Sequence, residues 1–197
     1  MSDDIETMTQ QTRDRYRLGT DGRFRVAELP TRPPDDRASD KTLKQELRQQ
    51  VKQLHDLQRR LFADGQHALL VVFQAMDAAG KDSTIRKVFS GVNPAGFRHT
   101  AFGAPAGRET RQDFLWRCQR ALPGRGKIGI FNRSHYEEVL IVRVQPEILA
   151  AQRLPDIHPE TVWQERMESI RAWERHLSRN GVTIVKFWLN VSRDEQK

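Results

Sequence analysis

The sequence lacks the features that mark secreted, membrane-spanning and cysteine-zinc proteins. Cys118 is the only cysteine, so no disulfide can form within the chain and no cysteine set can hold zinc. The acidic start of the chain has no apolar stretch typical of a secretory signal, and no run of about 18 apolar residues could cross a membrane. Together with a mean hydropathy of −0.72, these absences predict a soluble protein without a membrane partner, in the reducing cytoplasm.

Two common catalytic signatures are also missing. The 6 histidines show no spacing typical of metal ligands. No segment of the form G-x-S-x-G, which carries the nucleophile of many hydrolases, occurs. The sequence therefore argues against a zinc enzyme and against a serine hydrolase of that kind.

Basic residues are in excess. The chain has 33 Lys and Arg against 26 Asp and Glu, for a net charge of +7. Such a charge favours polyanionic partners, which include nucleic acid, anionic membranes and phosphate-rich substrates. It is also compatible with a generally basic proteome, so charge alone does not identify a partner.

The first part of the chain predicts an arm followed by a long helix. Residues 1–38 carry mixed charges, glycines and prolines without periodicity, which indicates an extended arm over the domain surface. Beyond it, Asp40 is a candidate N-cap and Gly65 a candidate end. Between them one apolar stripe predicts a helix: Leu43, Leu47, Val51, Leu54, Leu57 and Leu61. The stripe is narrow enough for a dimer seam, although packing on the chain's own domain is favoured.

Strand and helix patterns then alternate. Short apolar runs predict strands at 68–73, 97–102, 127–131 and 182–189. Helical patterns separate or follow them at 83–90, 109–122, 136–142 and 160–179. This order predicts a parallel sheet with helices on both faces. A length of 197 residues favours one such domain, over 40–197, after an extension over 1–39.

The segment between the first strand and the next helix carries the chemistry. Residues 74–84 read QAMDAAGKDST, which resembles the P-loop pattern G-x-x-x-x-G-K-[ST]. Loop amides and a helix N-terminus can hold phosphate there, with Gly80 allowing close approach and Lys81 supplying charge. Ala75 replaces the first glycine and Asp82 replaces the usual Ser or Thr, so a small-residue turn with a solvated lysine is the alternative.

This segment is one of five blocks that resemble the polyphosphate kinase 2 family. The blocks stand in the family's order and spacing, and the similarity extends over about residues 22–196. They read MDAAGKDST from residue 76, SGVNP from 90, DFLWR from 113, GIFNRSHYEEVL from 129 and RVQPE from 143. Within the family, the chain is most similar to the branch that phosphorylates AMP or ADP with polyphosphate.

The resemblance implies a fold and a set of site residues. The fold is a three-layer α/β/α P-loop kinase fold with a parallel sheet and a helical N-terminal extension. Asp77 and Asn132 are expected to orient Mg²⁺, although a neutral amide is a weaker ligand than a carboxylate. Lys81 and Arg133 are expected to stabilise the transferring phosphoryl group. The expected phosphate- or nucleotide-binding residues are Ala78, Ala79, Gly80, Asp82, Ser83, Thr84, Arg86, Lys87 and Arg117.

Several of these assignments have plain alternatives. Arg133 could be a surface arginine paired with Glu137 or Glu138. Arg86 and Lys87 could line a polyphosphate channel or be solvated on a helix, and Arg117 is a further channel candidate. Aromatic residues of the DFLWR block are expected in the core rather than stacked on a base.

The expected reaction is in-line, Mg²⁺-dependent phosphoryl transfer between inorganic polyphosphate and AMP, ADP or ATP, in which positioning and charge stabilisation dominate. The chain ends at Lys197, shortly after a capping-box pattern at 192–195. The resemblance implies a further third with a helical lid. We therefore expect a truncated chain with weak or absent activity, since lids complete many kinase sites.

Other hypotheses remain open from the sequence. The chain could be an ATP-using nucleoside monophosphate kinase, or an inactive, truncated binding protein. A basic nucleic-acid-binding module is disfavoured because aromatic residues are not interleaved with the basic ones. Homo-oligomerisation stays open.

Overall fold

The computed structural model describes residues 15–19 and 25–196, which fall into two units, Met1–Pro33 and Pro34–Lys197. Of the predicted N-terminal arm, residues 1–14 and 20–24 lie outside the described residues. In the described part of the first unit, η1 (Val26–Glu28) is a short 3₁₀ turn without a buried residue. The boundary that the sequence suggests after residue 39 stays a prediction.

The second unit is built on a four-stranded parallel sheet. Its strands are β1 (Ala68–Ala75), β2 (Phe97–Ala101), β3 (Ile128–Asn132) and β4 (Val182–Leu189). All three neighbouring pairs are parallel, and the spatial order is β2-β3-β1-β4. The parallel sheet predicted from the apolar runs is confirmed, with strand ends that differ by two residues or fewer.

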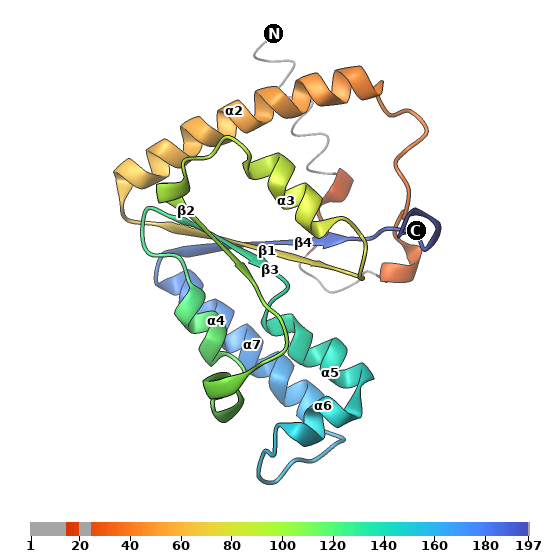
Figure 1. Ribbon diagram of the computed structural model, residues 1–197, viewed down its shortest axis with the longest axis vertical. Coiled ribbons are helices and arrows are strands. Elements are labelled where there is room, and N and C mark those ends of the chain that lie inside the picture. Colours follow the sequence, from red (N-terminus) through yellow and green to blue (C-terminus); the bar gives the residue numbers. More distant parts are fainter. Residues whose placement is uncertain (1–14, 20–24, 197) are drawn as a thin grey trace. The chain divides into compact units, whose positions relative to one another are not determined.

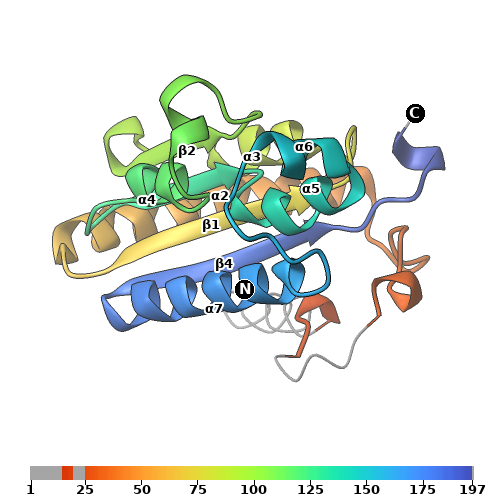
Figure 2. The same cartoon turned by 90° about the horizontal axis from the view of Figure 1, so that it is seen from below.

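Helices cover both faces of this sheet (Figures 1 and 2). One face carries α2 (Asp40–Asp64) and α3 (Lys81–Phe89), and the other carries α4 (Trp116–Ala121) and α7 (Val162–Arg179). The alternation of β1 serves both faces, because successive strand residues point to opposite sides. The described helices include none with the length and apolarity that a bilayer crossing requires.

The two apolar cores follow from that alternation. Val71 and Phe73 of β1 pack into the cluster beneath α2 and α3. Leu70 and Val72 pack into the cluster on the other face, together with Cys118. Burial raises the pKa of the Cys118 thiol to about 12. This cysteine therefore packs as a small apolar side chain and is not poised as a nucleophile.

The long helix α2 begins one residue earlier than its predicted cap implies. The hydroxyl of Ser39, not the carboxylate of Asp40, accepts from the amide of Thr42. Asp40 is wrong as the cap because it already lies in the first helical turn, while Ser39 has the extended conformation of an N-cap. The predicted end is confirmed, since Gly65 closes the helix in the left-handed region.

The apolar stripe of α2 packs on its own domain. Leu54 and Leu61 contact the cluster beneath α3. Leu57 does not follow them and is 57% exposed. The polar Gln58 is buried in its place, against Gly96, where a Cβ atom would lie 1.7 Å from the Gln58 amide nitrogen. Helix phase explains this, since the stripe drifts around the surface over seven turns of a straight helix.

Two predicted helices are interrupted. The predicted helix over 109–122 is a 3₁₀ turn at Gly107–Arg111 followed by α4, because the Asp113 carboxylate accepts from the Leu115 amide at 2.9 Å and forms a local turn. The predicted helix over 136–142 is divided into η4 (His135–Val139) and α5 (Ile141–Val144). A further short helix, α6 (Pro146–Ala151), begins with a proline that the sequence analysis did not use.

The chain leaves β1 and β3 toward opposite faces of the sheet. After β1 it forms α3 on one face, and after β3 it forms η4 and the helices that lead to α7 on the other (Figure 1). Since β1 and β3 are neighbours, a crevice opens between the two connections at the carboxyl ends of the strands.

Candidate functional site

The loop after β1 turns tightly into the N-terminus of α3. Ala78 and Gly80 both have positive φ, 60° and 82°. The left-handed conformation suits glycine, and at Ala78 it is tolerated at a cost by a small side chain. A Cβ atom at Gly80 would meet the Ser83 hydroxyl oxygen at 3.3 Å, so glycine also gives the loop room.

The backbone amides of this turn remain available. Among the described residues, Ala79 donates weakly to Met76 O at 3.4 Å and Thr84 donates to Gly80 O at 3.0 Å. For the amides between them, which open α3, the described part of the chain supplies no acceptor. Free amides at the N-terminus of a nine-residue helix favour an anion.

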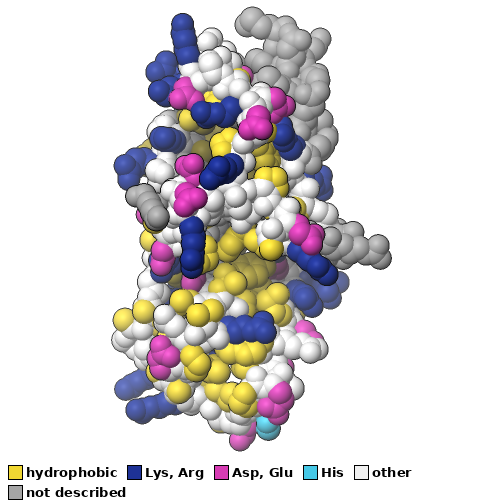
Figure 3. Space-filling view, turned by 90° about the vertical axis from the view of Figure 1, so that its right-hand side faces the viewer, with side chains coloured by type: hydrophobic (Ala, Val, Ile, Leu, Met, Phe, Trp, Pro, Cys, Tyr) yellow, Lys and Arg dark blue, Asp and Glu magenta, His cyan; other side chains and the backbone are white. Residues whose placement is uncertain are grey.

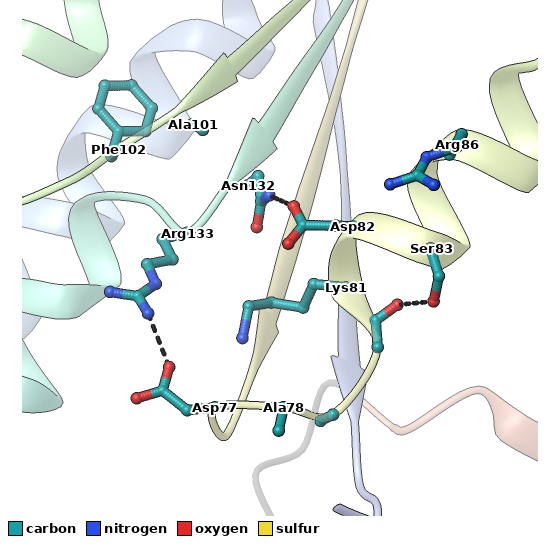
Figure 4. Close-up of a pocket in the computed structure, with 12 residues that line it drawn as sticks. Asp77, Ala78, Lys81, Asp82, Ser83, Arg86, Ala101, Phe102, Asn132 and Arg133 are labelled. Carbon is teal, nitrogen blue, oxygen red and sulfur yellow. Dashed lines mark hydrogen bonds and ion pairs between the residues drawn. The ribbon is translucent and has the colours of Figure 1, made fainter.

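Lys81 reaches back over the loop. Its side chain is 8% exposed, and its ammonium group donates to the carbonyl oxygens of Ala75 and Met76, each at 3.0 Å. Figure 4 shows the ammonium group between the loop and Arg133. A solvated lysine, the alternative that the pattern left open, is therefore excluded.

Arg133 enters the same space from the end of β3. Its amide donates to Phe73 O at 3.1 Å, and its own φ is 62°, so the chain turns sharply at this residue. The guanidinium donates to the Asp77 carboxylate at 2.6 Å. The alternative partners Glu137 and Glu138 do not hold it. Instead, Glu137 accepts from Gln74, and Glu138 is bound by Arg166.

Asn132 and Asp82 form a second link between the two strand ends. The Asn132 amide group donates to the Asp82 carboxylate, a contact between residues 50 positions apart in the sequence. With this orientation the Asn132 side-chain oxygen stays free to accept. The carboxylate of Asp82 and the amide of Asn132 thus lie together beside Lys81 (Figure 4).

These residues surround one cavity of about 510 Å³. It lies at the carboxyl ends of β1, β2 and β3, on the face shown in Figure 3, which is hollowed near its middle, with Lys and Arg side chains around the hollow. The lining consists of Asp77, Ala78, Ala79, Gly80, Lys81, Asp82, Ser83, Arg86, Ala101, Phe102, Asn132 and Arg133.

Most predicted site residues line this cavity, and three do not. Arg86 lines it, whereas Lys87 on the next position of α3 does not. Thr84 lies inside α3, where its amide bonds to Gly80 O. Arg117 is 9% exposed and donates to Gly103 O at 2.6 Å. Arg117 therefore links segments inside the protein, and its predicted contact with phosphate stays a prediction.

Sequence reasoning missed two lining residues at the end of β2. Ala101 and Phe102 complete the cavity wall opposite the loop. Their signal was present, because the predicted strand over 97–102 ends there and parallel strands bring their carboxyl ends to one edge. The Arg117 guanidinium also packs over the Phe102 ring, 5.4 Å from its centre.

The cavity offers hard oxygen ligands of the kind that Mg²⁺ prefers. Two carboxylates, of Asp77 and Asp82, and the amide oxygen of Asn132 line it. The described residues contain no cluster of three or more His, Cys, Asp or Glu side chains suited to a metal. The set fits a magnesium ion that takes its remaining ligands from water and phosphate, and it does not fit an all-protein cage.

A parallel sheet with a glycine-lysine loop at its switch point, covered by helices on both faces, defines a P-loop protein of the α/β/α kinase fold. A model of the family described as polyphosphate kinase 2 matches residues 37–197. The chain belongs to the polyphosphate kinase 2 family.

Characterised relatives support this assignment. The chain is 47% identical over 184 residues to the ADP-polyphosphate phosphotransferase of Rhodopseudomonas palustris, covering 92% of this chain. It is 46% identical over 187 residues to the AMP/ADP-polyphosphate phosphotransferase of Meiothermus ruber, covering 93% of this chain. The crystal structure of polyphosphate kinase 2 from Arthrobacter aurescens superposes with a TM-score of 0.79 at 35% identity, over 91% of this chain.

The shared region is shorter than those proteins. The chain spans 64% of the length of the Rhodopseudomonas relative and 65% of the Meiothermus relative. It covers 61% of the Arthrobacter chain. The similarity establishes the family and the fold of this chain.

Proposed function

We propose that the chain binds inorganic polyphosphate and a nucleoside mono- or diphosphate, AMP or ADP, and supports phosphoryl transfer between them. The observation that carries this proposal is the convergence of Lys81 and Arg133, from two adjacent strand ends, on one cavity lined by free loop amides. The two relatives from Rhodopseudomonas and Meiothermus, an ADP-polyphosphate and an AMP/ADP-polyphosphate phosphotransferase, agree with this substrate class.

The residues divide the work by charge. Phosphoryl transfer needs little covalent help from the protein, so catalysis consists of aligning the reactants and stabilising charge on the transferring group. Lys81 and the amides after Gly80 would hold phosphate oxygens. Arg133 would neutralise charge that develops on the transferring group, and Arg86 would receive the adjoining part of the polyanion.

Magnesium would be held by oxygen donors of the cavity lining. Asp77 and Asn132 are the ligands expected from the family resemblance, and Asp82, whose carboxylate contacts Asn132, is a further oxygen donor in the lining. When bound, Mg²⁺ would neutralise phosphate charge and hold its oxygens in register. A cytoplasmic location and a homo-oligomeric state stay predictions.

Donor and acceptor can be tested in one set of assays. The chain is incubated with Mg²⁺ and ADP or AMP, with either polyphosphate or ATP as donor, and products are separated by ion-exchange chromatography. In parallel, calorimetry measures binding of tripolyphosphate. We expect tripolyphosphate binding that Lys81→Met weakens at least tenfold, and transfer, where it occurs, from polyphosphate in preference to ATP. Equal binding by wild type and Lys81→Met would contradict the proposal, and efficient use of ATP alone would favour an ordinary nucleotide kinase.

Lys87→Met provides a matched control. Lys87 lies on the same helix but does not line the cavity. Its loss removes the same charge from the chain without touching the loop. We expect this variant to bind tripolyphosphate within about threefold of wild type, because a single exposed charge contributes little at ordinary salt.

A further inference from the structure

The turn that carries Arg133 is fixed on both sides. On its N-terminal side, the Arg133 amide continues the strand ladder to Phe73 O. On its C-terminal side, Ser134 and His135 are fully buried, and the Ser134 hydroxyl caps η4 by accepting from the Tyr136 amide at 3.2 Å. A positive φ at a long side chain is strained, and such a conformation persists only where its neighbours hold it.

The Glu174 carboxylate on α7 contacts two residues that follow the Arg133 turn, His135 and Tyr136. Glu174 Oε1 accepts from the Tyr136 hydroxyl at 2.8 Å and lies 3.4 Å from His135 Nε2. Glu174 Oε2 accepts from the Lys186 ammonium on β4 at 2.8 Å. Lys186 also donates to the Tyr136 hydroxyl at 2.9 Å. Glu174 therefore links η4 to α7 and to the neighbouring strand.

The Glu174 carboxylate in this cluster is largely buried, and its hydrogen bonds are satisfied. The Glu174 side chain is 15% exposed and His135 is wholly enclosed, with its ring 4.8 Å from the Trp173 ring. A partly buried charge is retained at a cost unless its hydrogen bonds are satisfied, and here three donors satisfy it. The cavity lining includes none of Glu174, His135, Tyr136 and Lys186. His135 and Tyr136 instead follow the turn that presents Arg133, and Glu174 contacts both of them.

We propose that Glu174 is a positioning residue for Arg133: through His135 and Tyr136 it holds the turn after β3 so that the guanidinium is aimed into the cavity before phosphate arrives. The inference rests on the proposed function, since Arg133 is taken as a phosphate ligand. Preorganisation of a charged donor improves anion binding because the ordering cost is met during folding.

The test is a double-mutant cycle on tripolyphosphate binding. Calorimetry is run on wild type, Glu174→Gln, Arg133→Met and the double variant, with circular dichroism and thermal unfolding to establish that each is folded. We expect Glu174→Gln to raise the Kd about three- to tenfold, and the double variant to bind no more weakly than Arg133→Met alone. Non-additivity of this kind indicates that the two residues act through one another.

Two further variants separate positioning from general stability. Glu168→Gln removes an exposed carboxylate of α7 that bonds only to Gln164 among the described residues, and it should leave the Kd unchanged. Tyr136→Phe removes one hydroxyl while keeping the ring, and it should raise the Kd in the same direction as Glu174→Gln. The NMR signal of the Arg133 side-chain Nε–H, assigned by its loss in Arg133→Met, should broaden or shift in Glu174→Gln before any ligand is added.

The outcomes are distinguishable. If wild type fails to bind tripolyphosphate, both the proposed function and this inference are overturned. If wild type binds while folded Glu174→Gln and Tyr136→Phe bind equally well, only the inference is overturned. Additive effects of Glu174→Gln and Arg133→Met, with an unchanged Arg133 signal, would likewise overturn it.

Discussion

At the scale of single residues, two cationic groups of the site, those of Lys81 and Arg133, already have partners within the chain. Lys81 is bound to two loop carbonyls, and Arg133 is bound to Asp77. These contacts hold the side chains in position, and they are also the contacts that an arriving anion must replace or share. The loop is therefore preorganised in shape and partly neutralised in charge.

Asp77 is expected to aid phosphate binding when Mg²⁺ is present and to oppose it when Mg²⁺ is absent. Its carboxylate is 88% exposed and pairs with Arg133, so it competes with phosphate for the guanidinium when no cation is present. In Mg²⁺-free buffer, Asp77→Asn should tighten tripolyphosphate binding by up to about fivefold, the scale of a surface ion pair. Calorimetry checks this, with Asp56→Asn, an exposed carboxylate on α2, as the control. Weaker binding by Asp77→Asn in that buffer would contradict the competition.

Gly129 is required by a close approach of the chain within β3. A Cβ atom at this position would lie 2.7 Å from Cδ and 2.9 Å from Cγ of the Pro123 ring, which cannot rotate away. We expect Gly129→Ala to lower the free energy of unfolding by about 1–3 kcal/mol through overpacking. Urea denaturation measures this.

Gly124→Ala is the matched control for that substitution. An added Cβ atom at Gly124 meets nothing within 4 Å, and this glycine does not have positive φ. The free energy of unfolding of Gly124→Ala should stay within about 0.5 kcal/mol of the wild-type value. If the two variants were equally stable, the close contact with Pro123 would not be a constraint on the strand.

Which residues could be found from sequence depended on how local their signal was. Gly80 and Lys81 were predictable because one loop contains the whole phosphate-binding pattern. The Asp82–Asn132 pair and the Glu174 cluster were not, since their members lie on different elements and meet only when β1, β3 and α7 are assembled. Arg117 does not line the cavity for a related reason: its partners, Gly103 O and Glu138, come from segments whose packing the sequence does not reveal.

At the scale of elements, η4, the 3₁₀ turn that follows β3, is held at both ends by charged side chains of α7. Glu174 binds its beginning, and Arg166 donates to the carbonyl and the carboxylate of Glu138 near its end. Arg166 and Glu138 are both almost fully buried. Short 3₁₀ and α segments have little stability of their own, so these cross-links decide where η4 lies.

The Glu174 link makes stability depend on acid pH in a defined direction. Burial alone would raise the pKa of Glu174, but donors from His135, Lys186 and Tyr136, with the Lys186 charge, outweigh it and lower the pKa to about 2. A carboxylate with a lowered pKa stabilises the fold above its ordinary value of 4.5 and loses that contribution as pH falls toward 2.

The corresponding measurement compares wild type with Glu174→Gln. Urea denaturation is carried out at intervals from neutral pH down to about pH 3. Wild type should be the more stable protein at neutral pH. The difference should shrink below about pH 4.5, because the unfolded state then takes up a proton that the folded protein takes up only near pH 2. A difference that stayed constant throughout would contradict the lowered pKa.

The elements themselves were predicted well where one physical signal dominated. The four strands and α7 were found because continuous apolar runs and helical periodicity are strong over their length. The predicted helix over 109–122 failed because a single side chain, Asp113, bonds to the backbone and stops the helical turn. Leu57 was predicted to lie on the packed stripe of α2 but is exposed, because the regular spacing of apolar residues drifts around a helix of 25 residues.

At the scale of the whole molecule, sheet order is what creates the site. The strand order β2-β3-β1-β4 places β3 beside β1, so the glycine-lysine loop and the Arg133 turn open at the same crevice. Had the strands been paired in sequence order, β3 would lie one strand further away. The sequence predicted a parallel sheet, but the order of its strands came from the structure.

The net charge of +7 is also a property of the whole molecule. A general excess of basic residues attracts any polyanion, but it cannot align one for reaction. What distinguishes the crevice is the combination of directed amides, two cations from different strands and carboxylates that suit Mg²⁺. Binding of polyphosphate should accordingly weaken with salt while remaining dependent on Lys81 at every salt concentration.

The central claim is that phosphate is bound where the loop after β1 meets the turn after β3. A crystal structure of the chain with tripolyphosphate and Mg²⁺ tests it most directly. The account predicts one phosphate group between the amides that open α3, the Lys81 ammonium and the Arg133 guanidinium. Tripolyphosphate bound elsewhere, with Lys81 still on its loop carbonyls and Arg133 still on Asp77, would contradict it.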